Sequence, residues 1–269
     1  MIESRLTRVL LGLGTGATLA FIYVPLILIG FYAFNESVTQ SWPIENFSTK
    51  WFSVAYHNEA VRDALQLSVL AALGATAVAL VLGTLVSLAV SRYRFFGRET
   101  ISLVVILPIA LPGIITGLAL QTTYATVGID FSILTIIIGH ATFCIVVVYN
   151  NAAARLRRLA GSLEEASYDL GADALQTFRY VTFPQMRTAL LAGGLLAFAL
   201  SFDEVIVTIF TSGAQQTLPI RIYANLFRPT EQPIVNVVAL FLIAVSIIPV
   251  YLAQKLSLGA VRGVPGGEK

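Results

Sequence analysis

The sequence predicts an all-helical membrane protein with six transmembrane helices. Its 269 residues have a mean hydropathy of +0.80, and only 12% of them are charged, whereas soluble domains carry roughly a quarter charged residues. The charges are clustered and leave long stretches with almost none. About 20 helical residues cross a hydrocarbon core, and a helix satisfies its own backbone hydrogen bonds there. We therefore expect one transmembrane domain over residues 1–269.

Six stretches are long and apolar enough to be transmembrane helices. They cover residues 9–34, 64–91, 100–128, 131–154, 188–210 and 232–254. The first is 26 residues long and lacks a clear cleavage site, so we expect it to be retained rather than removed as a signal peptide. Pro108 and Pro112 should kink or break the third helix. Glycines in the second and fifth, such as Gly83 and Gly193, predict close helix contacts.

Positively charged residues predict the orientation. If both termini are cytoplasmic, 13 of the 17 Lys and Arg residues lie on the cytoplasmic side. Only Lys50, Arg62, Arg221 and Arg228 then lie on the other side. Because cytoplasmic loops are enriched in Lys and Arg, we expect cytoplasmic termini, with residues 155–187 as the long cytoplasmic segment.

That segment has the pattern of two short helices joined by a tight turn. Ser162 followed by Glu165 predicts a capping box at the start of the first helix. Gly171 supplies the left-handed residue that commonly ends a helix. A second amphipathic stretch follows, and Pro184 marks the entrance to the fifth transmembrane helix. A bent cytoplasmic plug of this kind can transmit force to a partner.

The segment resembles the coupling loop of the MetI-like permease subunits of binding-protein-dependent ABC importers. The hallmark of that family is E-A-A, three residues, G, then a hydrophobic pair and a proline. The residues at or within the motif here are Glu165, Ala166, Ser167, Asp169, Gly171, Ala172, Phe178, Val181 and Pro184. Ser167 replaces the third small residue of the motif, and the match lies between the fourth and fifth predicted helices.

The resemblance implies a fold, a location and a set of partners. It implies the six-helix type I importer fold in a bacterial inner membrane, with residues 162–184 seated in a groove of a separate ATPase. It also implies a second, similar permease subunit in a heterodimer, two ATPase subunits that bind ATP and magnesium, and an extracytoplasmic solute-binding protein. The sequence contains no G-x-x-x-x-G-K-[ST] motif, so we expect a non-catalytic chain without a cofactor of its own. The net charge of +2 does not indicate nucleic-acid binding.

Two carboxylates lie inside the fifth predicted helix. Asp203 and Glu204 are flanked by AFALS and VIVTIF, and no Lys or Arg lies in any of the six stretches. Intramembrane charges cost about 2.5–3.5 kcal/mol each on insertion scales and usually face a cavity. An unpaired acidic pair suits a cation that arrives and leaves. Either residue could face the pathway, and a hydrogen bond within the helix bundle is the alternative for one of them.

The same region resembles the spermidine/putrescine branch of the permease family. The resemblance is carried by FALSFDEVIVTIF and TLPIRIYANL, and it implies that Asp203, Glu204, Ser201 and Trp51 line a polyamine pathway. An ammonium over an indole gains about 0.5–2 kcal/mol, although Trp51 could equally belong to an interfacial aromatic belt. Other members carry an acidic residue near the position of Gly113.

Other functions remain open from the sequence. The same architecture could import another small cation or nutrient, such as a ferric ion or a phosphonate. An ion-coupled secondary carrier would usually show paired repeats, which this sequence lacks. His140 fits hydrogen-bonded packing or, as an alternative, a metal or proton role. The single cysteine, Cys144, excludes a disulfide within the chain.

Overall fold

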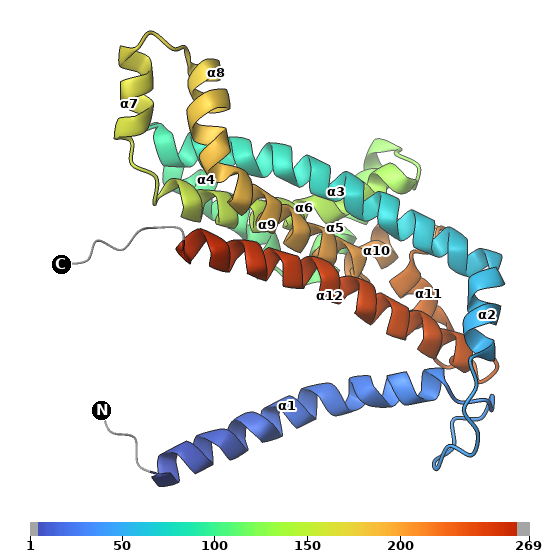
Figure 1. Ribbon diagram of the computed structural model, residues 1–269. Coiled ribbons are helices and arrows are strands. Elements are labelled where there is room, and N and C mark those ends of the chain that lie inside the picture. The colour runs from blue at the N-terminus through green and yellow to red at the C-terminus, as the bar shows by residue number, and fades with distance from the viewer. Residues whose placement is uncertain (1–4, 263–269) are drawn as a thin grey trace. The chain divides into compact units, whose positions relative to one another are not determined.

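Helices make up most of the part that the computed structural model describes (Figure 1). That part is residues 5–262, with side chains described to Leu256. Within it, β pairing is limited to one isolated antiparallel bridge between Asn35 and Phe47. Five of its helices are long and apolar enough to cross a membrane, and one bent helix pair would make a sixth span. The predicted all-helical membrane fold is therefore confirmed.

The chain forms two compact units. Residues up to Arg62 and Ile222–Ile243 form the first, and Asp63–Arg221 with the residues from Ala244 form the second. The first contains α1 (Arg5–Ala33), α2 (Lys50–His57) and the start of α12 (Gln232–Arg262). The second is built on α3 (Glu59–Arg92), α4 (Arg98–Ala110), α5 (Gly113–Val127), α6 (Ile133–Leu156), α7 (Ser162–Asp169), α8 (Ala174–Thr177), α9 (Phe183–Phe202) and α10 (Ile206–Thr211). The short helix α11 (Leu218–Asn225) crosses the boundary between the units.

Small residues bring α3, α6 and α9 close together in the core of the second unit. A Cβ atom at Gly83 would lie 3.0 Å from the Ile145 carbonyl oxygen on α6, and one at Gly193 would lie 3.2 Å from the Asn151 Cβ atom. Substituents at either position would crowd α6, because protein interiors are close-packed. The predicted close contacts at these glycines are confirmed. Together these helices form a packed scaffold for the polar groups described below.

The third predicted span is broken, as its prolines indicated. The helices α4 and α5 are bent by 104°. Pro108 lies within α4, whereas Leu111 is extended (φ −81°, ψ 143°) and Pro112 occupies the N-cap position of α5. A proline disfavours helical geometry in the residue before it, which explains why the break falls at Leu111.

The fifth predicted span, 188–210, is also interrupted. Helix α9 ends at Phe202, and α10 begins at Ile206. The short helix α10 packs closely on α5 and α6, where a Cβ atom at Gly117 would lie 2.6 Å from the Phe210 ring and one at Gly139 would lie 3.2 Å from Thr211. Glycines on α5 and α6 therefore make room for α10.

Candidate functional site

The interruption between α9 and α10 places the two intramembrane carboxylates on irregular backbone. Asp203 is the C-cap of α9 (φ −98°, ψ 3°), and the last backbone bonds of that helix are long, at 3.3 and 3.4 Å for the amides of Asp203 and Glu204. Non-helical backbone at membrane depth is tolerated where it is buried in protein or lines a cavity. We refer to residues Asp203–Val205 as the α9–α10 break.

The two carboxylates have different surroundings. One carboxylate oxygen of Glu204 accepts a 2.9 Å hydrogen bond from the backbone N–H of Val207, so it caps the first turn of α10. Glu204 is partly buried and Asp203 is exposed. Among the residues with described side chains, none makes a hydrogen bond or ion pair with the Asp203 carboxylate. The sequence allowed one of the two carboxylates to form a hydrogen bond within the helix bundle, and in the structure that carboxylate is Glu204.

Ser201, the third residue predicted on the pathway, is 3% exposed and bonded to a histidine. Its hydroxyl lies 2.7 Å from the Nδ1 atom of His140 on α6. The other ring nitrogen, Nε2, lies 2.8 Å from the Thr208 hydroxyl on α10. His140 is therefore a buried residue with both ring nitrogens hydrogen-bonded. No group of three or more His, Cys, Asp or Glu that could hold a metal occurs in the described part of the chain.

The predicted turn of the 162–184 segment forms around Gly171. Helix α7 ends at Asp169, and Gly171 shortly after it has left-handed backbone (φ +83°). The Gly171 amide bonds the Tyr168 carbonyl at 2.9 Å, and the Ala172 amide bonds the Ser167 carbonyl at 3.1 Å, which is a Schellman motif. We refer to residues 162–177 as the α7–α8 hairpin, whose two helices lie side by side in Figure 1.

The predicted capping box at Ser162 and Glu165 is wrong. The N-cap of α7 is Gly161, and no side chain bonds to the amides of the first turn. A capping box forms instead at the start of α8, where Asp173 and Gln176 exchange bonds of 2.8 and 2.9 Å. The helix starts one residue earlier than the pattern predicted, which makes Ser162 the first helical residue.

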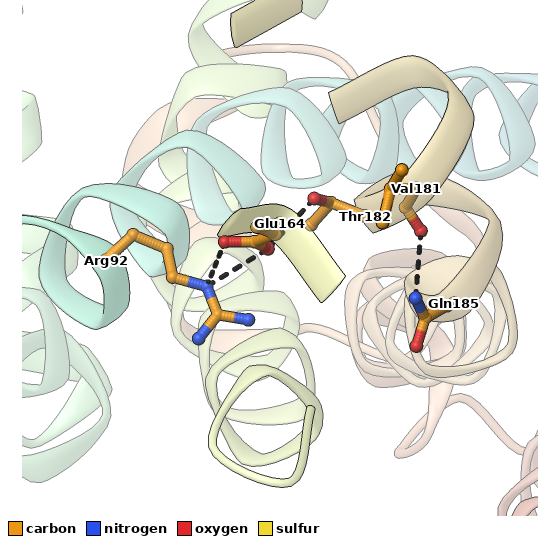
Figure 2. Close-up of polar contacts among 5 residues, drawn as sticks. All are labelled: Arg92, Glu164, Val181, Thr182 and Gln185. Carbon is orange, nitrogen blue, oxygen red and sulfur yellow. Dashed lines mark hydrogen bonds and ion pairs between the residues drawn. The ribbon is translucent and has the colours of Figure 1, made fainter. Parts of the chain in front are cut away.

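Glu164, rather than its neighbour Glu165, holds the hairpin on the helix bundle. The Arg92 Nε atom at the end of α3 lies 2.9 and 3.2 Å from the two Glu164 carboxylate oxygens. The Thr182 hydroxyl donates to the same carboxylate at 2.9 Å, from a π-helical turn (Phe178–Thr182) that leads into α9. Figure 2 shows Arg92 and Thr182 contacting the carboxylate, with the Gln185 amide bonded to the Val181 carbonyl nearby.

The hairpin exposes large apolar side chains beside charged ones. Leu170 is 89% exposed and Leu175 is 73% exposed. Glu165, Ala166, Asp169 and Pro184 from the predicted coupling set are also exposed, whereas Ser167, Ala172 and Phe178 are partly buried. Ser167 bonds the Thr177 hydroxyl at 3.0 Å, and so joins α7 to α8. Large apolar side chains that are this exposed are candidates for contact with a partner.

Comparisons with known proteins identify the family. Residues 79–262 match the family described as "Binding-protein-dependent transport system inner membrane component". The chain is 34% identical to the putrescine transport system permease protein PotI of Escherichia coli K12, over 91% of this chain and 90% of that protein. It is 30% identical to the spermidine/putrescine transport system permease protein PotC of the same strain, over 97% and 99% of the two chains.

The chain belongs to this family of importer permeases. The fold agrees, because a bacterial ABC transporter that imports the polysaccharide alginate superimposes with a TM-score of 0.71 and 18% identity, covering 95% of this chain and 99% of that one. The resemblance inferred from the E-A-A motif is thus confirmed at the level of the family.

Trp51 of this permease lies on α2 in the first unit. Its indole N–H donates to the Glu36 carbonyl at 3.3 Å, and the Lys50 ammonium lies 4.9 Å from the ring centroid. Trp51 therefore has a cationic neighbour within its own unit, and a polyamine ammonium would have to compete with Lys50 for the indole.

Sequence reasoning missed Glu164, Arg92 and the partners of His140. Glu164 and Glu165 are identical neighbours, and the motif alone favours Glu165. Arg92 is one of many basic residues near helix ends, and 72 positions separate it from Glu164. The sequence does indicate that His140 has hydrogen-bond partners, because a polar ring in an apolar helix requires them when it is buried. It does not indicate which residues they are.

Proposed function

We propose that this chain is the permease subunit of an ABC importer that moves a polyamine such as putrescine or spermidine across a bacterial inner membrane. The named functions of the PotI and PotC relatives support this substrate class. In this proposal the chain provides part of the pathway and no catalysis. ATP and magnesium are bound by separate ATPase subunits, a second permease completes the pathway, and an extracytoplasmic binding protein delivers the solute.

The observation that carries the proposed substrate role is the Asp203 carboxylate at the α9–α10 break. Glu204 is engaged with the amide of Val207 and Ser201 with His140, so Asp203 is the acidic group of the break that is left to bind a ligand. A carboxylate bonds an alkylammonium by a charge-assisted hydrogen bond. An anionic solute such as a phosphonate would be repelled at this position.

The α7–α8 hairpin is the proposed docking surface for an ATPase subunit. Its exposed leucines provide apolar contact area, and its turn is held by the Schellman motif around Gly171. This assignment requires the hairpin to face the cytoplasm, which agrees with the distribution of Lys and Arg. Both termini are then cytoplasmic as well.

Two neighbouring substitutions test the substrate role of Asp203. Asp203→Asn and Glu204→Gln each remove one negative charge, so each is the control for the other. We expect Asp203→Asn to weaken putrescine uptake about 10- to 150-fold, the equivalent of a charged hydrogen bond of about 1.5–3 kcal/mol. Glu204→Gln keeps an acceptor for the amide of Val207, and uptake should change less than about threefold, a loss below about 0.7 kcal/mol.

The measurement is uptake of labelled putrescine by proteoliposomes that contain the complete transporter with its binding protein. Normal uptake by Asp203→Asn, together with normal assembly, would contradict the proposed role of Asp203. A panel of diamines, ferric ion and phosphonate in the same assay separates a polyamine from the other solutes. Uphill transport by this chain without its ATPase would instead establish a secondary carrier.

A further inference from the structure

His140 contacts both halves of the interrupted fifth span. It is 1% exposed on α6, and its two ring nitrogens bond Ser201 at the end of α9 and Thr208 on α10. The three side chains therefore form one polar connection that bypasses the α9–α10 break. Buried polar networks of this kind fix a single arrangement of the surrounding helices when every member is satisfied.

The hydrogen bonds determine which ring nitrogen carries the proton. The Thr208 hydroxyl lies 2.8 Å from the Glu204 carbonyl oxygen, and a carbonyl can only accept. Thr208 thus donates its one hydrogen to Glu204 and must accept from the Nε2–H group of His140. The Nδ1 atom of a neutral ring then accepts from the Ser201 hydroxyl. Neutral His140 is favoured because an unpaired charge in this buried position would be costly.

The resulting chain of bonds runs from α9 to the backbone of the break. Ser201 donates to His140, His140 donates to Thr208, and Thr208 donates to the Glu204 carbonyl, which directly follows Asp203. The Glu204 side chain caps α10 in addition. The Ser201, His140 and Thr208 side chains all have hydrogen-bond partners within the protein. The Asp203 carboxylate has none among the described side chains.

We propose that His140 is a positioning residue that fixes the α9–α10 break and thereby sets where the Asp203 carboxylate lies. Ser201 acts through His140 and does not contact the solute. This inference rests on the proposed function for the role of Asp203 in transport, but the position of Asp203 can be tested without transport. In this inference the Ser201–His140–Thr208 network fixes the position of one ligand-binding side chain, which simple core packing would not do.

The first arm of the test measures the position of residue 203 directly. The only native cysteine of the chain, Cys144, is buried, so Cys144→Ala with Asp203→Cys gives a single-cysteine reporter. The complete transporter is labelled with a cationic thiol reagent, and the labelled peptide is quantified by mass spectrometry. The variants are Ser201→Ala, His140→Phe and His140→Gln, which retains one acceptor and one donor. Thr142→Val is the matched control, because its hydroxyl bonds only the Gly139 carbonyl within α6.

We expect Ser201→Ala and His140→Phe to change the labelling rate at least about fivefold, while His140→Gln and Thr142→Val stay within about twofold, since only the first two remove a bond of the network. Unchanged labelling in both Ser201→Ala and His140→Phe would overturn the inference. If His140→Phe does not assemble, Ser201→Ala decides, because it removes a single oxygen atom.

The second arm uses the native Asp203 and measures putrescine transport. A positioning role predicts that Ser201→Ala raises KM about tenfold with little change in kcat, the equivalent of one misplaced charged hydrogen bond. A merely structural role would lower the amount of assembled transporter and leave KM unchanged. If labelling responds but Asp203→Asn still transports normally, the substrate role of Asp203 falls and the positioning of the break stands.

Discussion

Replacing Glu164 with glutamine should loosen the α7–α8 hairpin from the helix bundle. In the structure the Glu164 carboxylate forms an ion pair with the Arg92 guanidinium of α3 and accepts a hydrogen bond from the Thr182 hydroxyl of the π-helical turn. It is therefore the group through which α3, α7 and the entrance to α9 are joined. Glutamine keeps the size of the side chain and one acceptor oxygen, but it removes the charge.

The expected cost follows from the burial of the ion pair. The side chains of Arg92 and Glu164 are 22% and 17% exposed, so the pair lies between two limits. Exposed pairs contribute about 0–1 kcal/mol, and breaking a fully buried pair costs about 3–5 kcal/mol. The Arg92 Nη2 atom is already buried without a partner among the described side chains. Glu164→Gln therefore removes the main interaction that offsets the cost of burying the Arg92 charge. We expect about 2 kcal/mol, equivalent to about 25-fold more frequent opening of the hairpin.

Hydrogen exchange of the complete transporter measures this opening. Amides of α7 and of the π-helical turn should lose protection by about 25-fold in Glu164→Gln. The neighbouring Glu165→Gln is the matched comparison, because Glu165 is exposed and bonds no described side chain. Its exchange should match the wild type. In the same preparations, solute transported per ATP hydrolysed should fall in Glu164→Gln.

An Arg92→Gln variant completes a double-mutant cycle. If Arg92 and Glu164 stabilise the hairpin as a pair, the double variant costs less than the sum of the two single variants. Additive effects would show that the two residues act separately. Protection and coupling at wild-type levels in Glu164→Gln would refute the reasoning outright.

Two further predictions use glycines with matched controls. Gly171→Ala should destabilise the hairpin by about 1–2 kcal/mol, because the left-handed backbone (φ +83°) crowds a Cβ atom. The control Gly161→Ala should be neutral, because Gly161 has helical φ and open space around it. Hydrogen exchange of α7 compares the two variants, and equal protection would contradict the prediction. Gly117→Ala should lower the thermal unfolding midpoint of the complex by an amount worth about 1–3 kcal/mol, because its Cβ atom would lie 2.6 Å from the Phe210 ring, whereas Gly113→Ala makes an ordinary 3.5 Å contact. Equal midpoints for the two variants would show that α10 does not pack tightly on α5 in the assembled transporter.

The features that the sequence predicts well are those set by local chemistry. Helix positions follow from runs of apolar residues, because lipid excludes any other way of satisfying the backbone. Pro112 predicts the break in the third span, since the restriction on the preceding residue needs no tertiary contact. Gly171 predicts the turn of the hairpin for the same reason, through its own left-handed conformation.

The features that the sequence does not predict depend on tertiary contacts. The α9–α10 break contains neither proline nor glycine, and apolar residues flank it on both sides. It is held instead by His140 from another helix and by the Glu204 side chain. The choice between Glu164 and Glu165 likewise depends on which of two adjacent carboxylates faces Arg92. Adjacent residues of a helix point about 100° apart, and only the packed structure shows which direction is inward.

One nearly continuous helical segment connects the two candidate sites. Residues Ala174–Phe202 run from the α7–α8 hairpin through the π-helical turn to the α9–α10 break, a distance of about 43 Å at 1.5 Å per residue. Near the start of α9, the Arg155 side chain of α6 donates to the Gln185 carbonyl at 2.8 Å, and near the end of α9 His140 of α6 bonds Ser201. Because Arg155 and His140 join α6 to α9 near both ends of α9, and Gly193 of α9 lets it pack closely on α6, a force on the hairpin would displace α6 and α9 together. The break would then move with the hairpin as one body, and Asp203 would change its surroundings without any change in the bonds that position it.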